Sequence, residues 1–263
     1  MTSITRPRRS TAILLLAALI GVLAAVAAVF LRPWAAPVAE QASANEAVVL
    51  PAPLALPEHP HVLVFGDSWT YGSAATSPEL GYAYRLAALI DGSTTVDGGR
   101  GSGYLRQGID RPDFGTRIAA LDPSADYDLI ILQGSINDRA ENLSGYPAAV
   151  NAAWDRLVAL YPDTPVVILG PAPQVLPVEL GTARIDHALS SLAADRGWWY
   201  ISPVQDEWIT SDRYLSLIDT SEIGRDHPSD TGHAYLARRV AEALDTISDP
   251  VTRLAASEDH PTD

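Results

Sequence analysis

His61–Phe65 reads HVLVF and runs directly into Gly66-Asp67-Ser68-Trp69. A short, uninterrupted apolar run of this kind is typical of a strand that is buried on both faces of a parallel sheet. The polar residues that follow indicate a turn from strand towards helix. A serine in such a turn is most often a helix N-cap, but its hydroxyl can also point into a cleft at the end of the strand. This junction therefore starts the predicted sheet and supplies the first candidate site residue.

The same strand pattern recurs along the chain and alternates with helical segments. Further strands are predicted at Thr94–Val96, Asp128–Gln133, Pro165–Leu169 and Trp198–Ile201. Helices are predicted at Gly81–Ile90, Tyr146–Tyr161, Glu179–Arg196 and Thr231–Ile247. This alternation implies a three-layer α/β domain with a parallel sheet. Active sites of such domains gather just past the carboxyl ends of the strands.

The composition excludes several classes of site and partner. The formal net charge is −14, and every lysine-or-arginine position is an arginine. A strongly acidic chain repels phosphate backbones, so we expect no nucleic-acid partner and no charge-driven binding of the folded domain to anionic lipid. The chain has no cysteine. Disulfides, thiolate metal sites, a cysteine nucleophile and a lipidated N-terminal cysteine are therefore excluded.

The N-terminal segment has the pattern of a membrane anchor. Thr11–Leu31 is uncharged and follows Arg6, Arg8 and Arg9. At about 1.5 Å per residue it can span a hydrocarbon core of roughly 30 Å. Because the positive flank stays in the cytoplasm, the folded domain should face outwards. We predict a single-pass signal anchor, while Ala42-Ser43-Ala44 leaves open a cleaved signal peptide and a secreted protein.

The remaining boundaries follow from composition. We predict a basic cytoplasmic N-terminus at 1–10, the transmembrane signal anchor at 11–31, an Ala/Pro-rich linker at 32–60, one folded domain at 61–248 and a flexible tail at 249–263. We expect this protein to be a monomer.

Residues with catalytic potential follow several of the predicted strands. Asp97–Tyr104 is rich in glycine, so its backbone N–H groups could approach a ligand closely, although a flexible loop is the alternative. Asn137 could donate its amide to a developing oxyanion, or cap a turn. His227 precedes the last helix and is the usual kind of proton carrier. His233 falls inside that helix, and we interpret it as structural.

In this order, the candidate residues resemble the sequence blocks of the SGNH hydrolases, also called GDSL esterases and lipases. Gly66-Asp67-Ser68 is similar to the first block, Gly101 to the second, Asn137-Asp138 to the third and His227-Pro228 to the fifth. Gly99 and Gly103 are rivals for the second-block glycine. The resemblance covers roughly residues 61–247. It implies a flavodoxin-like sandwich with about five parallel strands.

The resemblance also implies a serine esterase that forms an acyl-enzyme. Ser68 would be the nucleophile and His227 the base, and the oxyanion hole would comprise the backbone N–H groups of Ser68 and Gly101 with the Asn137 side chain. No metal or organic cofactor is implied, and the substrate would be a small-molecule or glycan ester. The alternatives are an O-acetyl transferase or deacetylase acting on cell-wall glycans, and a non-catalytic surface binding protein on the same fold.

Two positions depart from the family pattern. Ser135 stands where the third block usually has glycine, and Gly224 stands where the aspartate of D-x-x-H is expected. The group that orients His227 is therefore open. We choose Asp226 as the nearest carboxylate. The alternatives are a backbone carbonyl, which would make a Ser–His dyad, and the carboxylates of Asp219, Glu222 and Asp230.

Overall fold

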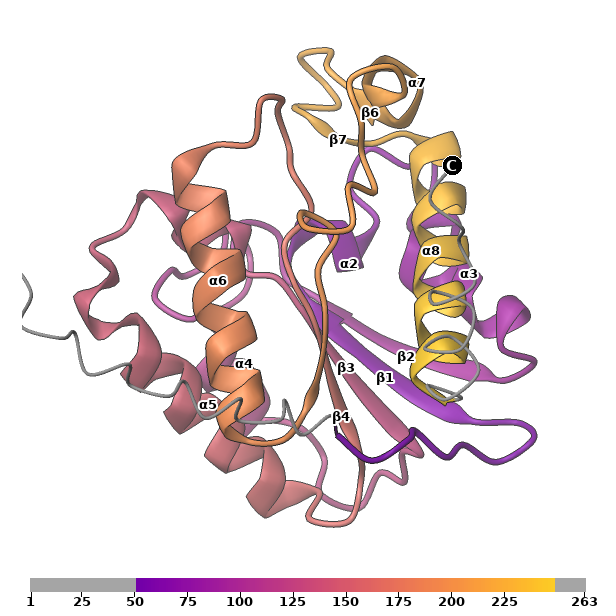
Figure 1. Ribbon diagram of the computed structural model, residues 1–263, viewed down its shortest axis with the longest axis vertical. Helices are drawn as coiled ribbons and strands as arrows, with labels where there is room; N and C mark the ends of the chain where they lie inside the picture. The colour runs from indigo at the N-terminus through magenta and orange to yellow at the C-terminus, as the bar shows by residue number, and fades with distance from the viewer. Residues whose placement is uncertain (1–50, 249–263) are drawn as a thin grey trace, which may run out of the picture. The chain divides into compact units, whose positions relative to one another are not determined.

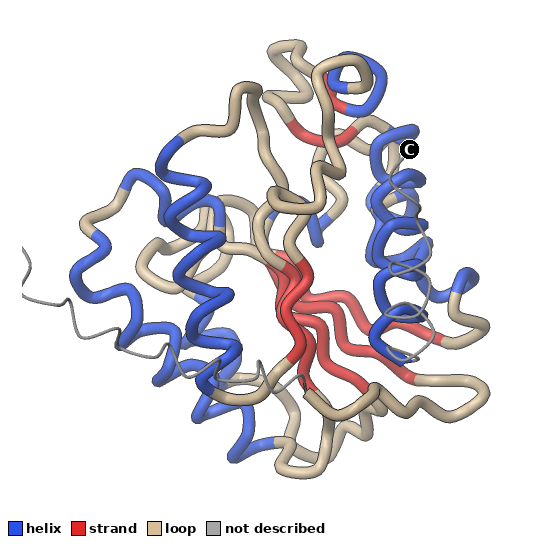
Figure 2. The backbone as a smooth tube through the Cα atoms, viewed as in Figure 1, coloured by secondary structure: helices blue, strands red, loops and turns tan. Residues whose placement is uncertain are grey.

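The computed structural model describes residues 51–248, and their centre is a five-stranded parallel sheet (Figure 1; Figure 2). The strand order is β2-β1-β3-β4-β5. The strands are β1 (His61–Gly66), β2 (Ser93–Gly98), β3 (Leu129–Gln133), β4 (Val166–Leu169) and β5 (Trp199–Ile201). All neighbours in this sheet pair in parallel. The predicted α/β fold with about five parallel strands is confirmed.

Helices cover both faces of the sheet. On one side lie α3 (Tyr82–Leu89) and α8 (Asp230–Ser248), and on the other lie α4 (Phe114–Ala119), α5 (Tyr146–Leu160) and α6 (Leu180–Asp195), as Figure 1 shows. The four predicted helices match α3, α5, α6 and α8 to within a residue or two. The six-residue helix α4 was not predicted.

Alternation along β1 divides the core into two halves. Successive side chains of a strand point to opposite faces. Val62 and Val64 accordingly pack into the cluster that contains the buried residues of α3 and α8, while Leu63 and Phe65 pack into the cluster beneath α4, α5 and α6. Because β1 is buried on both faces, its sequence is a continuous apolar run rather than an alternating one.

The short elements lie at the carboxyl end of the sheet. They are α2 (Ser68–Tyr71), the 3₁₀ turns at Pro78–Leu80, Ile136–Ala140 and Leu143–Gly145, helix α7 (Tyr214–Leu217), and a small hairpin of β6 (Ile218–Asp219) and β7 (His227–Pro228). In the hairpin, Asp219 pairs with His227 in an antiparallel ladder. This ladder fixes the backbone of His227 just before α8 begins.

The predicted anchor at 11–31, the linker up to residue 50 and the tail from residue 249 lie outside the described residues. Within residues 51–248, none of the helices combines the length and the apolar character that crossing a bilayer requires.

Candidate active site

Ser68 is the first residue of α2 and lies directly beyond the end of β1. Asp67 caps this helix, since its Oδ1 accepts a hydrogen bond from the Trp69 N–H at 3.0 Å. The turn presents the Ser68 side chain to a cleft of about 860 Å³, although only 4% of the residue is exposed. The strand-to-helix turn that the sequence predicted is therefore confirmed.

His227 lies against this serine. Its Nε2 is 2.8 Å from Ser68 Oγ, and its Nδ1 is 2.9 Å from the carbonyl oxygens of both Gly224 and Arg225. A carbonyl oxygen can only accept a hydrogen bond, so Nδ1 carries the proton and donates to both. Nε2 then has a free lone pair, which can accept the Ser68 hydroxyl proton. The two backbone carbonyls thus select the tautomer that a general base needs.

This geometry does not support the prediction that Asp226 orients His227. Asp226 lines the cleft, but within residues 51–248 its carboxylate forms no hydrogen bond with His227. Arg225 and Asp226 both have positive φ, +50° and +59°. This tight turn brings the carbonyls of Gly224 and Arg225 to Nδ1 of the imidazole ring, where an orienting carboxylate would act.

Two of the other candidate carboxylates are engaged elsewhere, and the third is exposed. Asp219 accepts from the backbone N–H of Ser221, and Asp230 accepts from the N–H and hydroxyl of Thr76. Glu222 is exposed. Among the described residues, no carboxylate reaches His227 Nδ1.

Steric crowding at position 224 leaves no room for a side chain larger than that of glycine. A Cβ atom built on Gly224 would lie 2.2 Å from Asp219 Cγ and 2.5 Å from the Asp219 carbonyl oxygen. An aspartate, the residue that the family pattern expects here, would therefore collide with Asp219 across the β6–β7 hairpin. Position 224 thus has no room for a side chain in this turn, and its backbone carbonyl bonds Nδ1 instead.

The three candidate glycines of the loop after β2 differ in whether their backbone N–H is already used. The N–H of Gly99 donates to the Gly66 carbonyl, and that of Gly103 donates to the Arg106 carbonyl. Gly101 lines the cleft with Ser68, has φ +74°, and makes no such bond within the described part of the chain. Its N–H is free for a ligand, so the geometry favours Gly101 over Gly99 and Gly103.

Asn137 brings a side-chain donor to the same cleft. Its Nδ2 donates to the Ser102 carbonyl at 3.0 Å, which holds the amide towards the glycine loop. An amide group has two N–H donors, so one stays available. Ser68, Gly101, Asn137 and His227, which the sequence predicted as one site, all line one cleft.

Asp138 is a buried carboxylate that holds the loops around the cleft together. It is fully buried, and its two carboxylate oxygens accept from the backbone N–H groups of Tyr104, Leu105 and Arg106 and from the hydroxyl of Ser135. These bonds tie the loop after β3 to the glycine loop. Ser135, the departure from G-x-N-D, thus has a partner of its own, and burial raises the pKa of Asp138 against the hydrogen bonds that favour the charged form.

Arg117 is a supporting residue that sequence reasoning missed. This arginine of α4 is 3% exposed. Its guanidinium donates to the Gly66 carbonyl, to the Ser102 hydroxyl, and to the Asp97 carbonyl and carboxylate, at 2.6–2.9 Å. It therefore links the ends of β1 and β2 to the glycine loop. An arginine in a short, unpredicted helix gives no sequence signal for this role.

Burial shifts two ionisable groups of the site. The pKa of Asp67 is raised to about 6 because the carboxyl is removed from water, and its Oδ2 has no hydrogen-bond partner among residues 51–248. Burial also lowers the pKa of His227, while its bonds to the Gly224 and Arg225 carbonyls oppose this shift. His227 therefore stays neutral down to a lower pH than an exposed histidine does, and in that form it can accept a proton.

His233 is structural, as predicted. It is fully buried; its Nδ1 accepts from the Tyr82 N–H at 3.2 Å, and its Nε2 donates to the Ser73 carbonyl at 3.0 Å. These bonds connect α8 to α3 and to the loop after α2. Burial lowers its pKa to about 4.

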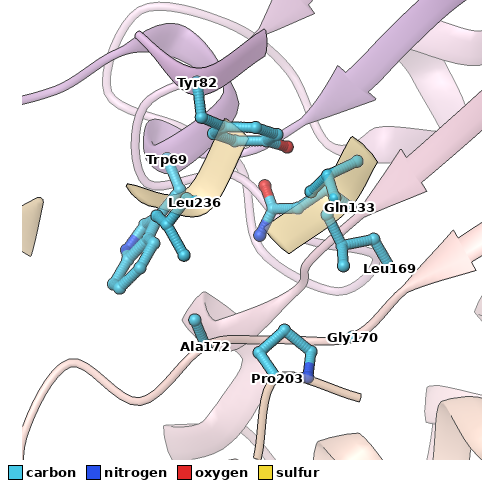
Figure 3. A pocket seen from close by; sticks show the side chains of 9 residues that line it. Trp69, Tyr82, Gln133, Leu169, Gly170, Ala172, Pro203 and Leu236 are labelled. Atoms are coloured by element: carbon cyan, nitrogen blue, oxygen red, sulfur yellow. The ribbon is translucent and has the colours of Figure 1, made fainter. Parts of the chain in front are cut away.

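A second, much smaller cavity lies beside Trp69 and is lined mainly by apolar side chains (Figure 3). Its volume is about 10 Å³, which is about the space of one water molecule. Trp69 itself is 2% exposed. This cavity is a gap in the core beneath α2 and is too small for a substrate. Within residues 51–248, no cluster of three or more metal-ligating side chains occurs.

Most of the described chain matches a known protein family. The family model of the GDSL-like lipase/acylhydrolase family matches residues 64–248. No curated protein sequence matches the chain significantly.

Solved structures with the same fold include esterases. A carbohydrate acetylesterase family member from Sinorhizobium meliloti has a TM-score of 0.53 at 18% identity, over 72% of this chain and 99% of that chain. The M. smegmatis aryl esterase has a TM-score of 0.51 at 18% identity, over 72% and 99%. A two-domain esterase active on acetylated mannans has a TM-score of 0.56 at 18% identity, over 72% of this chain and 50% of that one. Since the family match spans most of the folded domain, this chain belongs to the GDSL-like lipase/acylhydrolase family and is an ester-hydrolysing enzyme.

Proposed function

We propose that the enzyme hydrolyses a carboxylic ester through a Ser68–His227 acyl-enzyme mechanism on the outer side of the membrane. The observation that carries the mechanism is the 2.8 Å contact between His227 Nε2 and Ser68 Oγ, with Nδ1 held as a donor by backbone carbonyls. A non-catalytic binding protein would have no need of this alignment.

In the first half-reaction, Ser68 Oγ attacks the carbonyl carbon of the ester while His227 Nε2 takes the hydroxyl proton. The carbonyl π electrons move onto oxygen and form a tetrahedral oxyanion. When the oxyanion collapses, the bond to the alcohol oxygen breaks. The leaving oxygen takes the proton from His227 Nε2, so an alcohol departs and the acyl group stays on Ser68.

The second half-reaction repeats these steps with water. His227 Nε2 takes one proton of the water as its oxygen attacks the acyl carbon. Collapse of the second oxyanion breaks the bond to Ser68 Oγ, which recovers its proton from His227. The products are one carboxylic acid and the free enzyme.

Both oxyanions would be held by the free N–H groups of Ser68 and Gly101 and by the second N–H of Asn137. These donors are fixed before the substrate arrives, because Asp67, Arg117 and Asp138 hold the loops that carry them. Donors that need not reorganise during the reaction stabilise the transition state more than water does.

An acetylated carbohydrate is the substrate class we propose to test first. Two of the structural relatives are described as a carbohydrate acetylesterase family member and as an esterase active on acetylated mannans. The open, largely polar lining of the cleft suits a hydrated sugar ester better than a long acyl chain.

The location outside the cytoplasm is supported by the uncharged stretch at 11–31 and the arginines before it. Membrane fractionation of the natural protein tests it. Recovery in the membrane fraction, with the folded domain open to added protease, would support the anchor. Recovery of a soluble protein that begins near Asn45 would replace the anchor with a cleaved signal.

The mechanism is tested with a chromogenic acetate ester and the full-length chain. Ser68→Ala should abolish cleavage while the circular dichroism spectrum stays that of the parent, and a serine-directed phosphonate should label Ser68 alone. Ser73→Ala is the matched control, because Ser73 also lines the cleft but does not contact His227. Full activity of Ser68→Ala, or labelling of another serine, would overturn the mechanism.

A further inference from the structure

The cleft above Ser68 concentrates positive charge on a strongly acidic chain. The sequence has 18 arginines and 32 carboxylate side chains, for a net charge of −14. Among residues 51–248, Asp226 is the only carboxylate that lines the cleft, whereas four arginines line it. The arginines are Arg100, Arg106, Arg139 and Arg225.

These arginines come from three separate loops. Arg100 and Arg106 lie in the glycine loop after β2, Arg139 lies in the 3₁₀ turn after β3, and Arg225 lies in the turn before β7. Loops that are far apart in the sequence thus bring guanidinium groups to one cleft. The cleft therefore carries more positive than negative side chains, although the chain as a whole is acidic.

The four arginines divide into two kinds. Arg100 pairs with Asp110 at 2.7 Å, and Arg139 pairs with Glu179 at 2.8 Å; neither carboxylate lines the cleft. Arg106 and Arg225 are exposed, and within residues 51–248 neither forms an ion pair. Two guanidinium groups at the cleft are therefore held in place, and two are free to bind an anion.

We propose that the preferred substrate is an ester that carries an anionic group, a carboxylate or a phosphate, and that Arg106 and Arg225 bind this group. The inference rests on the proposed esterase function and narrows its substrates to those esters, acetylated carbohydrates included, that carry a negative charge. The planar guanidinium has the geometry to donate two parallel hydrogen bonds to a carboxylate or phosphate. An anion is repelled by the rest of this chain, and a cleft of opposite sign would guide it to Ser68.

The size of the expected effect follows from exposure. Solvent-exposed arginines contribute modestly to the binding of an anion, so loss of one of them should lower the preference for an anionic ester by about fivefold. Salt should reduce the same preference, because the Debye length falls from about 30 Å at 0.01 M to about 3 Å at 1 M. Replacement of both arginines should remove most of the preference.

The test compares three acetate esters on the full-length enzyme: 3-acetoxybenzoate, 3-acetoxyphenyl phosphate and the neutral 3-acetoxybenzamide. Each rate is divided by the rate of hydroxide-catalysed hydrolysis of the same ester. We expect a kcat/KM at low salt that is at least tenfold higher for one or both anionic esters than for the amide. The carboxylate and phosphate arms identify which anion the cleft prefers.

The variants are Arg106→Gln and Arg225→Asn, the latter because asparagine tolerates the positive φ at that position. Each should lower the ratio of anionic to neutral kcat/KM about fivefold, and Arg106→Glu should lower it further. Arg156→Gln on α5 is the matched control: it makes the same change in charge away from the cleft and should keep the parent's ratio.

The possible outcomes separate the two proposals. If the amide ester is cleaved and neither anion is preferred, or if the double variant keeps the preference, the anionic substrate class is wrong while the esterase mechanism stands. If none of the three esters is cleaved, the proposed function fails and the substrate class fails with it.

Discussion

The Nδ1 atom of His227 lies 2.9 Å from the carbonyl oxygen of Gly224, the residue that replaces the aspartate of the family pattern. The contact shows how a position that has lost its carboxylate can still orient the imidazole. A carbonyl selects the same tautomer as an aspartate does, but it carries only a partial negative charge. It should therefore stabilise the imidazolium less than a full charge would.

The first prediction concerns Asp226, the nearest carboxylate to His227 in sequence. Because the carbonyls of Gly224 and Arg225 hold Nδ1, Asp226→Asn should keep kcat within about tenfold of the parent. Loss of a true orienting aspartate costs about 10⁴-fold. Steady-state kinetics on a neutral acetate ester distinguishes these values. Asp219→Asn is the companion variant, and a severe loss in either would show that a carboxylate takes over in the substrate complex.

Asn137→Ala should lower kcat by about 10²–10³, the cost typical of the loss of one oxyanion donor. Its effect on KM should be small, because the bond to the substrate oxygen strengthens only in the transition state. Asn142→Ala is a control outside the cleft: this residue caps a 3₁₀ turn and should affect kcat little. A change confined to KM would make Asn137 a group that binds the substrate in its ground state.

The main elements of the fold could be predicted because their hydrophobic pattern is local. Four of the five strands are short apolar runs, the four longer helices have the helical period, and the alternation of strands with helices fixes the layers. Helices α4 and α7 are six and four residues long. Segments this short have little pattern of their own, and tertiary packing decides their conformation.

The site divides in the same way. Ser68, Gly101, Asn137 and His227 could be predicted together, since each lies at the carboxyl end of a strand or before the last helix. The partner of His227 could only be narrowed to Asp226, a backbone carbonyl or one of three other carboxylates, because the choice depends on two consecutive residues with positive φ and on the space that Asp219 fills. The hydrogen bonds of Arg117 could not be predicted either, since they join segments up to 51 residues apart.

Arg117 should be a positioning residue for the oxyanion hole. Arg117→Met keeps much of the side-chain volume but removes the bonds to Gly66, Asp97 and Ser102. Loss of one partner of a buried ion pair costs up to about 3–5 kcal/mol, and the cost should be lower here because Arg111 still pairs with Asp97 at 2.7 Å. We expect a lower midpoint of urea unfolding together with a lower kcat.

A kinetic readout separates positioning from stability in this variant. Since the glycine loop carries Gly101, a misplaced loop should lower kcat more than it raises KM. Arg117→Lys, which keeps the charge but loses the forked geometry, should recover part of kcat. A folded Arg117→Met enzyme with the parent's kcat would contradict the positioning role.

The activity should fall on the acid side with a midpoint below pH 6.5. The active base is neutral His227, and burial lowers its pKa, so protonation of the free enzyme begins at lower pH than for an exposed histidine. The midpoint is measured from kcat/KM, which reports the free enzyme. Asp226 contributes a small opposing effect by stabilising the imidazolium, so Asp226→Asn should move the midpoint to still lower pH. A midpoint at or above 6.5 would contradict the geometry.

Asp67 titrates in the same range and needs its own control. Its pKa is raised to about 6, so a second protonation near pH 6 can contribute to the acid limb. Asp67→Asn preserves the cap on α2 through its side-chain oxygen. If the acid limb of this variant matches that of the parent, the limb belongs to His227.

The stability of the fold should depend on His233 as the pH falls. His233 is neutral in the folded protein because burial lowers its pKa to about 4, whereas in the unfolded chain it takes up a proton near pH 6.5. Between pH 6.5 and 4 the unfolded state therefore binds more protons at this residue, so its contribution to stability is full above pH 6.5 and is lost as the pH falls through 4. The loss amounts to about 3 kcal/mol at most. Asp67 acts in the opposite sense between pH 3.8 and 6, since its raised pKa lets the folded state bind the extra proton.

The contributions of His233 and Asp67 to stability are separated by comparing a His233 variant with the parent protein at several pH values. His233→Gln should be less stable than the parent in urea at pH 7, because it loses contacts with Tyr82 and Ser73, but the gap should narrow steadily at pH 5.5 and 4.5. A gap that stays constant over this range would contradict the dependence of stability on the protonation of His233.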